Sequence, residues 1–107
     1  MCPSEVSDVE DAIWQAYEEE GVTVWGIAAQ EPVDAVAGFG ERQGLTYPLL
    51  LDPKGEIISI YSQHAAFESA AFPQDWVVGS DGRILYVNNV YDPEAIREVI
   101  EADLAAP

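Results

Sequence analysis

The sequence predicts an α/β domain with a mixed sheet and flanking helices. Three observations indicate this class: amphipathic stretches alternate with short apolar runs, turn residues separate them, and a hairpin pattern precedes the last helix. The chain has 107 residues, of which 49% are hydrophobic and 22% are charged. These proportions are typical of a globular protein, so we expect a single domain over residues 1–107.

The first expected elements are a helix over residues 4–20 and a strand from Val22 to Ala29. Ser7 and Glu10 have the spacing of a capping box, and Gly21 stands where a C-terminal cap would end the helix. The strand is almost wholly apolar, which is typical of a strand covered on both faces. The apolar residues of the helix fall on one stripe: Val6, Val9, Ile13, Ala16 and Tyr17.

A second helix and a second short strand follow. The helix is expected from about residue 31 to residue 43, with Pro32 in its first turn and Gly44 after its end. The strand covers residues 47–51. The β-branched side chains of residues 56–61 favour a strand, but their spacing also suits a short helix, so both structures stay open.

The last third of the chain predicts a hairpin and a closing helix. Residues 76–78 and 84–87 flank the turn at residues 79–82, which indicates an antiparallel pair. Asp92 as N-cap and Pro93 at the first helical position begin the final helix. The apolar residues of that helix lie on one face: Ile96, Val99, Ile100 and Leu104.

Charge and composition exclude several classes of function. With 4 basic and 20 acidic residues the formal charge is −16, which argues against binding to nucleic acid. No apolar run approaches the roughly 18 residues of a membrane span, and no export signal is present, so the default expectation is the cytoplasm. One cysteine and one histidine predict no metal site, and we expect no cofactor. The acidic residues are expected mainly on solvated helix faces.

Four segments carry a resemblance to a known family. They are Cys2-Pro3-Ser4-Glu5 at the start of a helix, the apolar run at 22–28, the stretch 44–52 and the stretch 72–84. Their order and spacing resemble the thioredoxin superfamily, in particular its TlpA-like and redoxin (AhpC/TSA-type) thiol–disulfide oxidoreductases. The resemblance covers essentially the whole chain, and it implies a thioredoxin-like fold with a role in antioxidant activity and redox homeostasis.

The resemblance also implies a site. In that family a Cys-x-x-Cys motif occupies the first turn of the helix; Cys2 matches its attacking cysteine, and Glu5 holds the position of the resolving cysteine. Pro73 matches the family's cis-proline, which contacts the substrate backbone, and Phe72 matches the residue before it. Without a second thiol, a mixed disulfide at Cys2 would need an external thiol, so Cys2 acts as a monothiol or the redox activity is lost.

The reactivity of Cys2 has opposing influences. A helix N-terminus favours the thiolate, whereas the charge of Glu5 one turn away disfavours it, so the direction of the pKa shift stays open. His64 is expected on a surface loop rather than beside Cys2. A peroxide-reducing role for Cys2 resembles the AhpC/TSA side of the superfamily. However, the segment that would supply the threonine of the Thr-x-x-Cys motif is absent, and no downstream arginine can be assigned to the peroxide site.

The resemblance further predicts an N-terminally truncated fold, because the family has a central strand directly before the redox motif. Its neighbours would be residues 22–28 and 76–78, so we expect a rearranged sheet or a homodimer that covers the gap, with Trp25 and Trp76 near the contact. Two functions follow from these features. The first is a thiol–disulfide oxidoreductase acting on a protein or low-molecular-weight disulfide through Cys2; the alternative is a non-catalytic dimerisation or partner-binding module.

Overall fold

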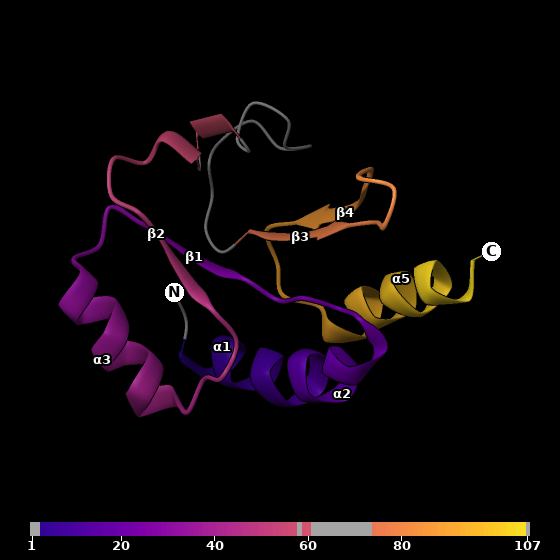
Figure 1. The fold of residues 1–107 in the computed structure, drawn as a ribbon, viewed down its shortest axis with the longest axis horizontal. Helices are drawn as coiled ribbons and strands as arrows, with labels where there is room; N and C mark the ends of the chain where they lie inside the picture. The colour runs from indigo at the N-terminus through magenta and orange to yellow at the C-terminus, as the bar shows by residue number, and fades with distance from the viewer. Residues whose placement is uncertain (1–2, 58, 61–73, 107) are drawn as a thin grey trace. The chain divides into compact units, whose positions relative to one another are not determined.

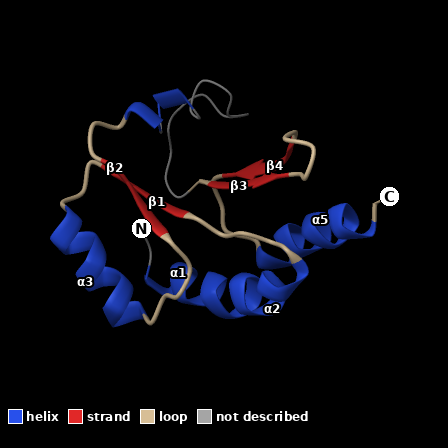
Figure 2. Ribbon diagram, in the orientation of Figure 1, coloured by secondary structure: helices blue, strands red, loops and turns tan. Residues whose placement is uncertain are grey.

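The computed structural model describes residues 3–57, 59–60 and 74–106 (Figure 1). The chain divides into two compact units, residues 2–70 and residues 71–107; in the described part of the chain the first contains helices and a pair of strands, and the second contains a pair of strands and one helix (Figure 2). Within the described ranges, no helix has the length and apolar character needed to cross a membrane.

The first unit begins with a helical run that changes its geometry along its length. It consists of α1 (Pro3–Val9), a π-helical turn (Glu10–Trp14), α2 (Gln15–Tyr17) and a 3-10 turn (Glu18–Glu20). The run ends at Gly21, which has a left-handed conformation with φ 88°. The expected helix and its glycine cap are therefore confirmed.

The apolar stripe of this helical run is only partly buried. Val6, Ile13 and Tyr17 are buried, whereas Ala16 is exposed. The π turn adds about one residue to a helical turn, which rotates all later residues by about 100°. Tyr17 therefore takes the angular position that residue 16 would have in a regular α-helix and stays on the buried stripe, whereas Ala16 leaves it.

A parallel pair of strands and a second helix follow in this unit. β1 (Gly26–Ala29) pairs with β2 (Leu49–Asp52), with Gly26 opposite Leu49 and Ala29 opposite Asp52. Between them runs α3 (Val33–Gln43), which ends at Gly44 with φ 66°. The predicted helix is confirmed, and both strands are displaced or shortened relative to the expected ranges.

One face of this small sheet is covered closely by α3. A Cβ atom on Gly26 would lie 2.7 Å from Cδ2 of Leu49, and one on Gly40 of α3 would lie 2.9 Å from Cδ1 of the same side chain. The side chain of Leu49 therefore fits against β1 and α3 because both contact points are glycines, Gly26 and Gly40. On the other face Ile27 and Leu50 are 36% and 38% exposed, so the expected burial of both faces is incomplete.

For residues 56–61 the sequence left both a strand and a short helix possible, and the structure describes all of them except residues 58 and 61. Residues 56, 57, 59 and 60 are helical, and the amide of Ser59 donates to the carbonyl of Gly55 at 3.1 Å. The short helix, one of the two possibilities left by the sequence, is the one that forms.

The second unit packs a hairpin against the last helix. β3 (Asp75–Val78) and β4 (Ile84–Asn88) are antiparallel, with an irregularity between Val77 and Val78. α5 (Pro93–Ala105) begins after Asp92, whose carboxylate accepts from the amide of Ala95 at 3.2 Å. Both predictions are confirmed. Along α5, Ile96 and Ile100 are buried, but Leu104 is 41% exposed.

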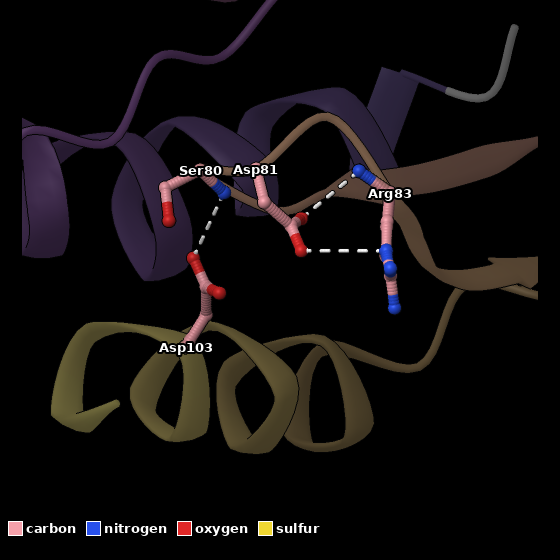
Figure 3. Close-up of polar contacts among 4 residues, drawn as sticks. All are labelled: Ser80, Asp81, Arg83 and Asp103. Carbon is pink, nitrogen blue, oxygen red and sulfur yellow. Dashed lines mark hydrogen bonds and ion pairs between the residues drawn. The ribbon is translucent and has the colours of Figure 1, made fainter. Parts of the chain in front are cut away.

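The hairpin turn is fastened to α5 by one hydrogen bond and is braced internally by two further polar contacts (Figure 3). The amide of Ser80 donates to Oδ2 of Asp103 at 3.3 Å. Within the turn, the amide of Arg83 donates to Oδ1 of Asp81 at 3.0 Å, and its Nε lies 3.6 Å from Oδ2 of the same carboxylate. The ion pair is exposed and adds little stability, so the turn depends mainly on its backbone contacts.

Candidate functional site

The first turn of α1 is the part of the expected redox site that the structure describes. Glu5, which the resemblance places at the position of the resolving cysteine, lies in this turn and is half-buried. Cys2, Phe72 and Pro73 lie outside the described residues, as does His64. The structure thus gives the helix that follows Cys2 and the strand that follows Pro73.

Two contacts fasten α1 to the end of α3 and to the connection between α3 and β2. The hydroxyl of Ser7 donates to Oε1 of Gln43 at 3.0 Å, and the hydroxyl of the buried Tyr47 donates to the carbonyl of Val6 at 3.3 Å. The expected capping box of Ser7 and Glu10 is therefore wrong. The helix begins at Pro3, and Ser7 lies within α1 and faces α3. These contacts fix the direction in which the helix start points.

A buried carboxylate forms the third and most extensive contact. Glu10 is only 6% exposed; its Oε1 accepts from the amide of Thr46 at 2.6 Å, and its Oε2 accepts from the Thr46 hydroxyl at 2.6 Å and from the side-chain amide of Gln15. The indole nitrogen of Trp14 also donates to the Thr46 hydroxyl, at 3.0 Å. The side-chain amide of Gln15 donates to the Thr46 hydroxyl as well, at 3.2 Å, so Thr46 of the α3–β2 connection is bound by three residues of the helical run.

The surroundings of Glu10 keep it ionised. Burial alone would raise the pKa of its carboxyl, but donors from Thr46, Gln15 and the amide of Tyr47 outweigh burial and hold the pKa below the ordinary value of 4.5. Hydrogen bonds to an ionised oxygen are the stronger kind, so this cluster is a firm anchor.

The π turn is what allows this cluster to form. The backbone amide of Gln15 donates to the carbonyl of Glu10, which is the five-residue bond of a π-helix, and the side chains of the same two residues bond to each other. The wider turn brings both side chains to the same side of the helix, toward Thr46.

The buried role of Glu10 was not predicted from the sequence, although its position carries a signal. Glu10 falls on the same helical stripe as Val6, Ile13 and Tyr17, all of which are buried. A carboxylate within an apolar stripe indicates a buried and partnered charge, since an unpaired one would be costly. Thr46 carried no comparable signal.

Gln74, the residue between Pro73 and the start of β3, is polar. The indole nitrogen of Trp76 donates to Oε1 of Gln74 at 3.3 Å, while Nε2 of Gln74 is buried without a hydrogen-bond partner in the described part of the chain. Of the two tryptophans expected near a contact between chains, Trp76 is half-buried and Trp25 is exposed. Among the same described residues, no three His, Cys, Asp or Glu side chains gather as metal ligands.

The arrangement of helices and strands defines the class of protein. The structure aligns with the crystal structure of a thiol:disulfide interchange protein, a thioredoxin family protein from Chlorobium tepidum TLS, with a TM-score of 0.81 and 21% identity. The alignment covers 97% of this chain and 71% of that one. The protein has a thioredoxin-like fold, as the resemblance predicts.

The sequence comparison gives the family. The model of the AhpC/TSA family matches residues 1–87, so the chain belongs to the AhpC/TSA family. Similar relatives include the thiol-disulfide oxidoreductase ResA of Geobacillus kaustophilus, 30% identical over 50 residues, and ResA of Geobacillus thermodenitrificans, 22% identical over 91 residues. These matches cover 47% and 84% of this chain, but only 29% and 49% of the relatives. The chain is a redoxin related to thiol–disulfide oxidoreductases, and it spans about half the length of these relatives or less.

Proposed function

We propose that this redoxin exchanges disulfides as a monothiol through Cys2. The observation that supports this most is the start of α1: Cys2 directly precedes the helix, and Glu5 occupies the first-turn position where a dithiol redoxin has its second cysteine. A carboxylate cannot attack a mixed disulfide to release it, so the dithiol route is closed to this chain.

The proposed exchange has two steps. The Cys2 thiolate attacks one sulfur of a disulfide; that S–S bond breaks, a mixed disulfide with Cys2 forms, and the other half leaves as a thiolate. A low-molecular-weight thiolate then attacks the mixed disulfide, takes the bound half as a new disulfide and leaves Cys2 as a thiolate again. The external thiol supplies the electrons, and Cys2 ends each cycle in its starting state.

The described residues support these steps through position and charge. The partial positive charge at the helix start favours the Cys2 thiolate, and the negative charge of Glu5 opposes it. The contacts of Ser7 and Glu10 hold the helix start in place. Phe72 and Pro73 are proposed to bind the backbone of a protein substrate, by analogy with the family.

Reaction with glutathione disulfide tests the proposal. Mass spectrometry should show one glutathionyl group on the wild-type chain and none on Cys2→Ser. Insulin reduction with dithiothreitol should be far slower than with a dithiol thioredoxin. Turnover that depends on Cys2 and equals that of a thioredoxin would overturn the monothiol mechanism.

The second candidate is a non-catalytic binding module, which the carboxylate at position 5 also favours. It is distinguished by a Cys2 that does not react with small disulfides although the chain is folded. Glu5→Gln separates the two further, because removing the charge should speed the reaction of an active Cys2 at neutral pH and leave an inert one unchanged.

A further inference from the structure

The hydroxyl of Thr46 joins three side chains of the helical run. It donates to Oε2 of Glu10 at 2.6 Å, and it accepts from the indole nitrogen of Trp14 at 3.0 Å and from the side-chain amide of Gln15 at 3.2 Å. A hydroxyl can donate one hydrogen bond and accept two, so these bonds use its full capacity. Thr46 is itself exposed, so these bonds, and not burial, are what its side chain contributes to the fold.

The three bonded residues lie in and directly after the π turn. Glu10 is the first residue of that turn, Trp14 is the last, and Gln15 follows it. π turns are rare within helices, so this one needs contacts from outside the helix to hold it. The first and last residues of the turn both bond to the Thr46 hydroxyl, which is such a contact.

The π turn sets the rotation of α1 relative to the residues that follow it. Because a π turn contains about one residue more than an α turn, a return of residues 10–14 to α geometry would rotate α1 by about 100° about its axis relative to α2. The observed rotation is the one in which α1 bonds to Gln43 and Tyr47.

The contacts at Thr46 hold this rotation more strongly than the other contacts of α1. The hydrogen bonds of Ser7 and of the Tyr47 hydroxyl join neutral groups. Those at Thr46 include two bonds of 2.6 Å to the Glu10 carboxylate, and hydrogen bonds to a charged group are roughly twice as strong as neutral ones. Loss of the Thr46 hydroxyl therefore removes a strong restraint on the π turn.

We propose that Thr46 is a positioning residue for the redox site: its hydroxyl holds the π turn and so fixes the rotation of the helix that carries Cys2. This inference rests on the proposed function, because it assigns Thr46 a part in disulfide exchange through Cys2. One peptide bond joins Cys2 to Pro3, the first residue of α1, so a rotation of α1 redirects the thiol. Thr46 takes no part in the chemical steps themselves.

The size of the substrate decides how strongly this positioning affects the rate. A protein disulfide also contacts the surface around the thiol, so it reaches the sulfur from few directions, whereas a small disulfide can approach from many. A redirected Cys2 therefore loses more rate with a protein disulfide than with a small one. If Thr46 affected stability alone, its loss would lower both rates by the same factor, which is the fraction of folded chains.

The rate constants of Cys2 with insulin and with glutathione disulfide, followed by mass spectrometry of the mixed disulfides, test the proposal. Thr46→Val removes the hydroxyl and keeps the backbone amide, and it should lower the ratio of the insulin rate to the glutathione disulfide rate about tenfold. Thr46→Ser keeps the hydroxyl and should restore the ratio. Thr23→Val is the matched control, because it makes the same change at another exposed threonine of the first unit, and it should leave the ratio unchanged.

A second variant and a stability measurement accompany these rates. Gln15→Met keeps the length of the side chain and removes the amide that donates to Glu10 and Thr46, so it should lower the same ratio. Urea unfolding gives the fraction of folded chains for each variant under the conditions of the rate measurement.

The outcomes separate this inference from the proposed function. A folded wild type whose Cys2 reacts with neither disulfide overturns the proposed function, and the role of Thr46 with it. A wild type that reacts with both disulfides, and whose ratio is unchanged in Thr46→Val, overturns the positioning role alone. The same holds if Thr46→Ser does not restore the ratio, or if the wild type reacts with glutathione disulfide only, because there is then no protein exchange for Thr46 to orient.

Discussion

Replacement of Glu10 by glutamine should destabilise the fold although it changes few atoms. The carboxylate of Glu10 accepts from the amide and hydroxyl of Thr46 and from the side-chain amide of Gln15. A glutamine at position 10 keeps one acceptor oxygen and turns the other into a donor. The Thr46 hydroxyl can reverse its bond, but the amide of Gln15 would face a second amide and lose its acceptor.

The expected loss of stability in Glu10→Gln follows from the strength of hydrogen bonds to a charged group. A hydrogen bond to a charged group contributes about 1.5–3 kcal/mol to stability, against about 1 kcal/mol for a neutral one. Glu10→Gln weakens two such bonds and loses a third, while the lower cost of burying a neutral side chain offsets part of this. We expect a loss of about 2 kcal/mol for Glu10→Gln and about 3 kcal/mol for Glu10→Ala.

Urea unfolding at neutral pH measures these losses. Glu19→Gln is the control, because Glu19 belongs to the same helical run, is exposed and undergoes the same change of charge. The control should stay within about 0.5 kcal/mol of the wild type. If Glu10→Gln is as stable as Glu19→Gln, the hydrogen bonds of Glu10 do not anchor the helix.

Three further predictions concern acid, the redox motif and a helix cap. The pKa of the Glu10 carboxyl is lower in the folded chain than its ordinary 4.5, so the stabilisation by this carboxylate is present above pH 4.5 and is lost as the pH falls through the folded pKa. The difference in free energy of unfolding between the wild type and Glu10→Gln, measured by urea unfolding at several pH values, should therefore shrink in acid. Glu5→Cys should form an intramolecular disulfide with Cys2 on mild oxidation, seen by mass spectrometry as the loss of two hydrogens in monomeric chains, and disulfides formed only between chains would contradict this. Asp92→Ala should cost about 1 kcal/mol in urea unfolding, since the N-cap bond to α5 is lost, whereas the exposed mid-helix Glu98→Ala should cost clearly less.

Helices and turns whose ends are marked by particular residues within or next to them could be predicted from the sequence. Asp92 and Pro93 mark the start of α5, Gly44 marks the end of α3, and the turn at residues 79–82 marks the hairpin. Each signal acts through the backbone of a few neighbouring residues, so no tertiary contact is needed to read it.

Features that depend on distant contacts could not be predicted. Thr46 meets Glu10 across 36 positions of sequence, and nothing near Thr46 indicates this partner. The exposure of Ala16 follows from the π turn, which forms around that same contact. Of the expected site, the structure describes only Glu5, which lies in the first turn of α1, and the roles of Cys2, Glu5, Phe72 and Pro73 stay predictions.

The π turn at Glu10–Trp14 affects how this chain should be aligned with its relatives. A π turn arises when a helix gains a single residue and keeps its hydrogen bonds by widening one turn. A relative whose helix is α throughout reaches the same end point with one residue fewer. The correct alignment then has a one-residue gap within positions 10–14, even though gaps are usually placed in loops. An alignment that moves this gap to Gly21 would match α2 to the wrong face of the relative's helix.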